Sequence, residues 1–249
     1  MNVNKFVDTH PSNQNAIECF PALWYSKFPD EYKVQSGDCL AFEDGRLKWA
    51  LDNFDIENNW DVLELGPLEG AHPFYLERNT PVKSITSIEG NRQCWLKCLI
   101  TKEITDLKRT RFLLGNFEEY LKHCEEQFDL GLAIGVLYHM KNPLELISLI
   151  SSCCERIIIW TQLAGKKQEE DWKTTSLSYE NLEVQGYICD YGSVPEKDEF
   201  IGGVGKYSVW LKKDCLIKSL EHFGFKKITW GDQGTNQFGH QATLIAQKA

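Results

Sequence analysis

Short apolar runs alternate with amphipathic stretches through the middle of the chain. The apolar runs have the length and β-branched content of buried strands, and the longer stretches between them have a helical character. The predicted strands cover residues 62–65, 84–88, 111–114, 130–134 and 156–160. The predicted helices cover residues 71–77, 92–103, 117–126 and 143–152. Strands that alternate with helices form parallel βαβ units, so this pattern predicts an α/β fold with a doubly wound, mostly parallel sheet.

The alternation stops after residue 160 and resumes near residue 212. The stretch at about 163–206 is polar, acidic and dotted with glycines, and it is too long for an ordinary loop. It predicts a lid-like or substrate-binding insertion after the fifth strand. A helix at 212–223 follows, with Gly224 as its C-cap, and then strands at 227–230 and 242–246. No helix fits between these two strands, so we expect them to be antiparallel.

The N-terminal 55 residues differ in character from the rest. They are rich in aromatic residues and irregular, except that residues 44–54 place Leu47, Leu51 and Phe54 on one face of a short amphipathic helix. We expect residues 1–55 to form a cap on the substrate side, and residues 56–249 to form the main domain.

Composition narrows the class of protein. The 249 residues are 42% hydrophobic and 25% charged, enough for one domain with a substantial core. The net charge of −9 and the lack of a dense basic run disfavour nucleic acid as a partner. No stretch approaches the roughly 20 apolar residues of a membrane helix, and the N-terminus has no apolar signal core, so we expect a cytoplasmic protein. The oligomeric state stays open.

Nine scattered cysteines, none of them in a CxxC pair, are typical of reduced thiols. Cys94 and Cys98 are four residues apart and could bind a metal with His123 or Cys124. Burial in a helix that faces the core explains them more simply, so we expect no metal site.

Candidate chemistry gathers where the predicted strands end, because a parallel sheet binds ligands outside the carboxyl ends of its strands. The first feature is residues 64–70, Glu-Leu-Gly-Pro-Leu-Glu-Gly. Gly66 and Gly70 permit a sharp turn and close approach of a ligand. Leu68 stands where a dinucleotide site needs the glycine that admits a pyrophosphate. This departure favours a ligand without phosphate and disfavours an NAD-dependent oxidoreductase.

Two more features follow the second and third strands. Glu89 lies 23 residues after Gly66, and a carboxylate there can accept both hydroxyls of a ribose. Asn116 can hydrogen-bond an adenine amino group, or it can cap the next helix, and Phe117 can pack on the adenine ring.

The fourth feature is residues 134–139, Ile-Gly-Val-Leu-Tyr-His, after the fourth strand. It places Tyr138 and His139 where a reacting group would lie, and histidine can act as a general base near neutral pH.

Together these features resemble the successive motifs of the class I S-adenosylmethionine-dependent methyltransferases. The similarity covers roughly residues 55–162 and the final strand pair. It implies a seven-stranded, Rossmann-like sheet whose last strand is antiparallel, with S-adenosyl-L-methionine lying across the first strands. The family commonly has another glycine at the position of Leu68 and an Asp at the position of Asn116.

The resemblance also implies a set of cofactor-binding residues. Those near the methionine portion would be Glu64, Gly66 and Gly70, while Glu89 would hold the ribose. Asn116 and Phe117 would face the adenine. The full expected set is Glu64, Gly66, Leu68, Gly70, Glu89, Gly90, Asn116, Phe117 and Ile134.

The predicted reaction is transfer of a methyl group to an oxygen or nitrogen atom of a small-molecule acceptor. Such an enzyme aligns the reactants and excludes water, and His139 is the expected catalytic base. Aromatic residues are expected to line the acceptor site, although each of them also suits the core: Trp24, Tyr25, Tyr138, Tyr207 and Trp210.

Two alternatives stay open within this interpretation. Residues 135–144 are similar to a segment of the bacterial tRNA wobble-uridine carboxymethyltransferases, which use a carboxylated cofactor. The second alternative is a non-catalytic module that binds S-adenosylmethionine but has no usable acceptor pocket.

Overall fold

A computed structural model describes residues 6–192, apart from 55 and 58, and residues 205–249. Seven strands form the main sheet in the order β3-β2-β1-β4-β5-β10-β9. They are β1 (Asp61–Leu65), β2 (Ser84–Glu89), β3 (Thr110–Leu114), β4 (Leu130–Ile134), β5 (Arg156–Leu163), β9 (Phe225–Asn236) and β10 (Gly239–Lys248). Strand β10 is antiparallel to both neighbours, and the pairs among β1 to β5 are parallel. The predicted fold class is confirmed.

Helices cover both faces of this sheet, and alternate residues of each strand point to opposite faces. Ile157 and Ile159 of β5 join the core formed with α5 (Phe117–Lys122), α6 (Pro143–Cys153) and α8 (Lys213–His222). Ile158, between them, joins the opposite core with α2 (Gly45–Leu51) and α3 (Ala71–Asn79). All five residues of β4 are buried, as expected for a central strand covered on both faces.

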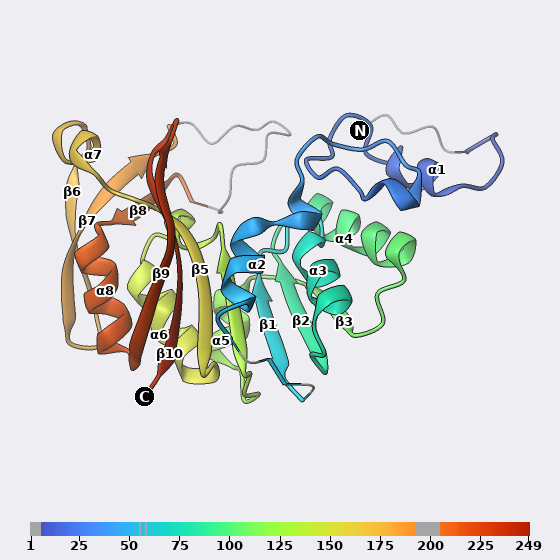
Figure 1. Cartoon of the computed structure of the whole chain (residues 1–249). Helices are drawn as coiled ribbons and strands as arrows, with labels where there is room; N and C mark the ends of the chain where they lie inside the picture. The colour runs from blue at the N-terminus through green and yellow to red at the C-terminus, as the bar shows by residue number, and fades with distance from the viewer. Residues whose placement is uncertain (1–5, 55, 58, 193–204) are drawn as a thin grey trace.

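The stretch expected as a polar insertion folds into regular structure. It contains α7 (Lys166–Asp171), β6 (Thr174–Tyr179) and β7 (Leu182–Asp190), and β8 (Tyr207–Leu211) completes a separate three-stranded antiparallel sheet. This small sheet lies beside α8 at one end of the main sheet (Figure 1). Its apolar residues, including Leu177 and Val184, join the core of α6 and α8. Residues 193–204 of the expected insertion lie outside the described residues, and a lid function stays a prediction.

The final strands are longer than predicted, and one helix is shorter. Strand β9 pairs with β10 up to Asn236 and Gly239, and β10 in turn pairs with β5 up to His240 and Leu163. The outer half of the edge strand β9 is largely solvated, so no apolar alternation signals it. Helix α5 ends at Lys122 instead of continuing to residue 126.

The N-terminal segment packs over α3 and α4 (Arg92–Thr105) at the other end of the sheet (Figure 1). It contains the short helix α1 (Asn13–Ile17) and two 3-10 turns, Asp30–Tyr32 and Ala41–Glu43. The rings of Phe28, Phe42 and Phe74 lie in mutual contact, with centroids 4.7 Å apart for the first two and 5.2 Å for the last two. Aromatic packing therefore joins the segment to α3.

A buried ion pair also attaches this segment to the main domain. Glu69, 1% exposed, accepts hydrogen bonds from the backbone N–H groups of Tyr25 (3.0 Å) and Ser26 (2.7 Å). Lys97 of α4 donates to the same carboxylate at 2.8 Å and to the carbonyl oxygen of Leu23. The glycine turn, α4 and the N-terminal segment thus meet at one carboxylate.

Replacing Lys97 with Met should lower the free energy of unfolding by about 3–5 kcal/mol, because Glu69 would remain buried without its counter-charge. The exposed pair of Lys83 and Asp61 provides a matched control, and Lys83→Met should change stability by less than about 1 kcal/mol. Chemical denaturation followed by tryptophan fluorescence measures both variants. Small and equal losses would show that the buried pair does not anchor the segment.

Candidate active site

The glycine turn between β1 and α3 contains three residues with left-handed backbone. Gly66, Leu68 and Gly70 have φ angles of +67°, +56° and +80°. A non-glycine residue in this conformation costs on the order of 1–2 kcal/mol, so Leu68 occupies a position that favours glycine. A Cβ atom on Gly70 would lie 3.2 Å from the Phe112 ring, which shows how closely the turn approaches its neighbours. The turn is held from behind by Thr101, whose hydroxyl donates to the carbonyl oxygen of Glu69 at 2.7 Å.

Glu89 lies at the end of β2, directly beside this turn. Its two carboxylate oxygens accept one backbone N–H each, from Leu68 at 3.1 Å and from Asn91 at 2.8 Å. Burial raises the pKa of this carboxyl group, and the backbone hydrogen bonds oppose that effect. Each oxygen retains a second lone pair, so the carboxylate can still accept two ribose hydroxyls.

The ends of β2 and β3 present a bare backbone surface. The N–H of Gly115 donates to the carbonyl oxygen of Glu89 at 2.9 Å, which brings Gly90 and Gly115 side by side. A Cβ atom on Gly115 would meet nothing within 4 Å, and one on Gly90 would lie 3.6 Å from the Gly115 oxygen. Flat, exposed glycines here leave room for a planar or ribose group to lie across the strands.

Asn116 and Phe117 follow this surface. The Asn116 side chain accepts from the Glu118 N–H at 2.8 Å, so it caps α5, which is one of the two roles its sequence allows. It is exposed, while Phe117 is half-buried against the core. Contact of either residue with adenine stays a prediction.

A charged network that the sequence analysis missed lies below the turn. The two ring nitrogens of His72 face the carboxylates of Glu64 (3.0 Å) and Asp44 (3.1 Å). Burial disfavours the charged ring, but these hydrogen bonds outweigh it and raise the pKa of His72 to about 9. His72 is therefore an imidazolium at neutral pH that donates to both carboxylates. Glu64 is also fixed by the hydroxyl of Ser87 at 2.8 Å.

Arg46 extends this network toward the ends of β4 and β5. Its guanidinium donates to both carboxylate oxygens of Asp44 and lies 4.5 Å from the Trp160 ring centroid. The side chains of Tyr25 and Tyr138 interact electrostatically with this guanidinium and contribute to raising the pKa of Arg46. The sequence offered only a weak signal for this network, because an Asp at the start of a helix is ordinarily just an N-cap. Asp44 does cap α2.

His139 lies in a 3-10 turn, Leu137–His139, after β4. Ile134, the last residue of that strand, is 8% exposed and pairs with Trp160. Burial lowers the pKa of His139 to about 4, so its imidazole is neutral near pH 7. The Tyr138 ring lies against it, with centroids 4.0 Å apart, and burial raises the pKa of Tyr138 to about 12.

The other aromatic candidates divide into two groups. Tyr25 and Tyr207 are 59% and 40% exposed and are free to meet a ligand. Trp24 is buried in the core of the N-terminal segment, where its indole N–H donates to the carbonyl oxygen of Ile17 at 2.9 Å. Trp210 is 5% exposed, and among the described residues no group accepts a hydrogen bond from its indole N–H. The geometry gives Trp24 the core-packing role that its sequence also allowed.

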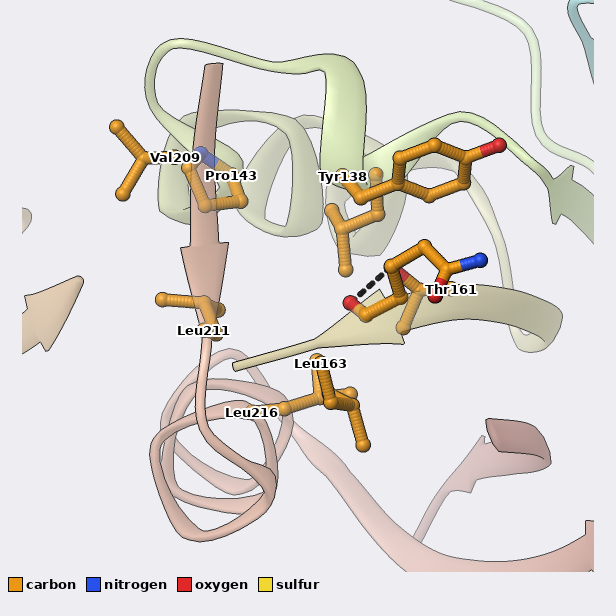
Figure 2. Close-up of a pocket in the computed structure, with 9 residues that line it drawn as sticks. Tyr138, Pro143, Thr161, Leu163, Val209, Leu211 and Leu216 are labelled. Carbon is orange, nitrogen blue, oxygen red and sulfur yellow. Dashed lines mark hydrogen bonds between the residues drawn. The ribbon is translucent and has the colours of Figure 1, made fainter. Parts of the chain in front are cut away.

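Two hollows in the described structure lie away from the glycine turn. A cavity of about 10 Å³ lies behind Tyr138, between β5 and β8, and Figure 2 shows the Tyr138 hydroxyl pointing away from it. It has room for no more than a single water. An open cleft of about 860 Å³ lies between α7, α8 and the ends of β9 and β10 near their connection, and residues of both charges line it, including Lys166 and Asp214. None of the predicted site residues lines this cleft.

Within the described residues, no helix is long and apolar enough to cross a membrane. The same part of the chain contains no group of three or more His, Cys, Asp or Glu residues arranged to hold a metal ion. Cys94 and Cys98 are buried thiols, and burial raises the pKa of Cys94 to about 12.

No family model and no curated protein sequence matches the chain. The fold is nevertheless shared with solved structures. The N-terminal domain of EvdMO1, crystallised in the presence of SAH and D-fucose, has a TM-score of 0.75 and 21% identity, and the alignment covers 95% of each chain. Complete EvdMO1 aligns with a TM-score of 0.63 and 18% identity, over 96% of this chain and 49% of its own. This chain therefore spans about half the length of that protein.

A further similar structure is an S-adenosylmethionine-dependent methyltransferase from Clostridium acetobutylicum ATCC 824. It has a TM-score of 0.55 and 11% identity, and the alignment covers 82% of this chain and 90% of that one. The chain thus has the fold of the S-adenosylmethionine-dependent methyltransferases, as the motifs predicted. The finer similarity to the tRNA wobble-uridine carboxymethyltransferases gains no support from these comparisons.

The His72 network predicts a specific dependence of stability on pH. The pKa of His72 is about 9 in the folded protein and about 6.5 when unfolded. Its contribution is therefore fully present below about pH 6.5 and is lost as the pH rises through about 9. The loss should be on the order of 3 kcal/mol, and His72→Gln should remove this part of the pH dependence. Denaturant unfolding of both proteins across this range measures the effect, and parallel curves would contradict it.

Proposed function

We propose that this protein is an S-adenosylmethionine-dependent methyltransferase that acts on an oxygen or nitrogen atom of a small-molecule acceptor. The observation that carries the proposal is the convergence of four features at one edge of the sheet. They are the glycine turn after β1, Glu89 after β2, the bare Gly90–Gly115 surface, and neutral His139 after β4. The shared fold supports this proposal.

The residues present suit this cofactor. Glu89 would hold the ribose with its free lone pairs, and Gly90, Gly115, Asn116 and Phe117 would border the adenine. Near the methionine portion, Gly66 and Gly70 allow close approach, and Glu64 orders the strand end through His72 and Ser87. When bound, S-adenosylmethionine would supply a methyl group on a cationic sulfur: the acceptor's lone pair would form the new bond to the methyl carbon, and the C–S bonding pair would leave with the sulfur as a neutral thioether.

Leu68 supports a cofactor without phosphate. Its side chain is half-buried, on a left-handed backbone, beside the Glu89 carboxylate that its own N–H contacts. A pyrophosphate would meet the leucine side chain where a dinucleotide site has a glycine. The same position therefore disfavours NAD for steric reasons.

The acceptor group that we favour is a hydroxyl. An alcohol must lose its proton as it attacks, and His139, which is neutral near pH 7, would act as the base. Its Nε2 would take the hydroxyl proton. The EvdMO1 domain was crystallised with D-fucose, so sugar hydroxyls are the first acceptors to test. Tyr25, Tyr138 and Tyr207 would offer hydrogen bonds and aromatic surface to such a ligand.

Glu89→Gln should weaken binding of S-adenosylmethionine by roughly 10- to 150-fold, because hydrogen bonds to a charged acceptor contribute about 1.5–3 kcal/mol. Isothermal titration calorimetry measures this, with NAD as a second ligand. The exposed Glu125→Gln is the matched control and should bind like the wild type. Binding of NAD without binding of S-adenosylmethionine would refute the proposal.

His139→Ala should reduce methyl transfer by about 10²- to 10⁴-fold if His139 is the base, while cofactor affinity stays unchanged. Wild-type activity should be constant near neutral pH and decline only as the pH falls toward about 4, where His139 becomes protonated. Transfer from radiolabelled cofactor to a panel of sugars, other alcohols, amines and tRNA measures both. Cofactor binding without transfer to any member would favour a non-catalytic module, and transfer to tRNA would favour the wobble-uridine alternative.

A further inference from the structure

Three side chains from different parts of the chain form a hydrogen-bonded line that begins at His139. His139 Nδ1 lies 3.1 Å from the Tyr191 hydroxyl, just after β7. The Tyr191 hydroxyl donates to the Ser208 Oγ in β8 at 2.7 Å. Ser208 is fully buried, and Tyr191 is half-buried. Neither Tyr191 nor Ser208 lies in a motif that the sequence marks as functional.

The backbone fixes the positions of these groups. Strands β7 and β8 pair Cys189 with Ser208, and the Tyr191 N–H donates to the carbonyl oxygen of Lys206 at 3.0 Å. The Val209 N–H donates to the carbonyl oxygen of Met140 at 2.8 Å, which ties β8 to the residue after His139. The small sheet therefore holds the Tyr191 and Ser208 oxygens at a set distance from the imidazole.

The donor in the hydrogen bond between Tyr191 and Ser208 decides the tautomer of His139. A tyrosine hydroxyl has one hydrogen, so with Tyr191 as the donor to Ser208 the same hydroxyl can meet His139 Nδ1 only as an acceptor. The proton of the neutral imidazole is then on Nδ1. Nε2 then carries a free lone pair.

We propose that Tyr191 and Ser208 are positioning residues that hold His139 in the tautomer with Nδ1 protonated and Nε2 unprotonated. The catalytic consequence rests on the proposed function, in which Nε2 takes the acceptor's proton. When it does, Nδ1–H continues to donate to Tyr191, which stabilises the imidazolium without a negatively charged partner. Burial raises the pKa of Tyr191, so it remains a neutral phenol throughout.

The test reads the tautomer directly and does not require activity. Long-range ¹H–¹⁵N NMR of protein labelled at histidine should show, for His139, a protonated Nδ1 and an unprotonated Nε2. His139→Gln identifies its signals among the six histidines. Ser208→Ala frees the Tyr191 hydroxyl hydrogen to donate to Nδ1, so the proton should move to Nε2. Tyr191→Phe removes the partner and should give a mixture of tautomers.

Matched controls come from β6 of the same small sheet. Tyr179→Phe and Ser178→Ala remove the same chemical groups outside the line and should leave the His139 signals unchanged. In the transfer assay, Tyr191→Phe and Ser208→Ala should lower kcat by roughly 10- to 100-fold without changing cofactor affinity.

The outcomes separate the two proposals. A wild-type His139 with its proton on Nε2 would overturn the inference, as would a tautomer that is identical in wild type and both variants, or a changed tautomer with unchanged kcat. If the tautomer shifts as expected but no acceptor is methylated, the hydrogen-bonded line stands and the proposed function fails.

Discussion

A carboxylate buried inside the glycine turn, that of Glu69, needs a counter-charge and hydrogen-bond donors, and three parts of the chain meet to provide them. Lys97 comes from α4, and the backbone N–H groups of Tyr25 and Ser26 come from the N-terminal segment. Leaving any one of these groups unpaired in the interior would be costly, so they fix one another's positions. The segment that brings Tyr25 toward the candidate site is therefore attached to the turn that we propose binds the cofactor.

A second buried charge on another side of the site follows the same physical rule. The imidazolium of His72 joins Asp44 of the N-terminal segment to Glu64 of β1, so a second buried charge connects the same two parts. Around His139 the arrangement is the opposite, since burial keeps its ring neutral and its nearest polar partner is an uncharged phenol. One histidine thus serves as a fixed cation that supports the structure, and the other is kept as a free base.

The hydrophobic pattern predicted the main sheet well, because strands covered on both faces are almost wholly apolar and contrast with their surroundings. It also placed Gly66, Glu89, Asn116 and His139 at strand ends, where parallel topology brings them to one edge. The pattern failed for β6 and β7 and for the outer ends of β9 and β10, whose exposed faces are polar. Their pairing depends on partners distant in the chain, so local sequence carries little of that information.

The sequence by itself determined the fold class and the residues that follow each strand. The reason is that local features indicate them: hydrophobic periodicity indicates which residues are buried, and glycines indicate where the chain turns. Tertiary structure alone decided which charges meet. Asp44, Glu69, Lys97 and Tyr191 look like ordinary surface or loop residues in the sequence, and the partners that join them to distant elements lie 17 to 52 positions away. Hydrogen bonds and ion pairs depend on distances in space. The order of residues along the chain does not give those distances; only the folded structure does.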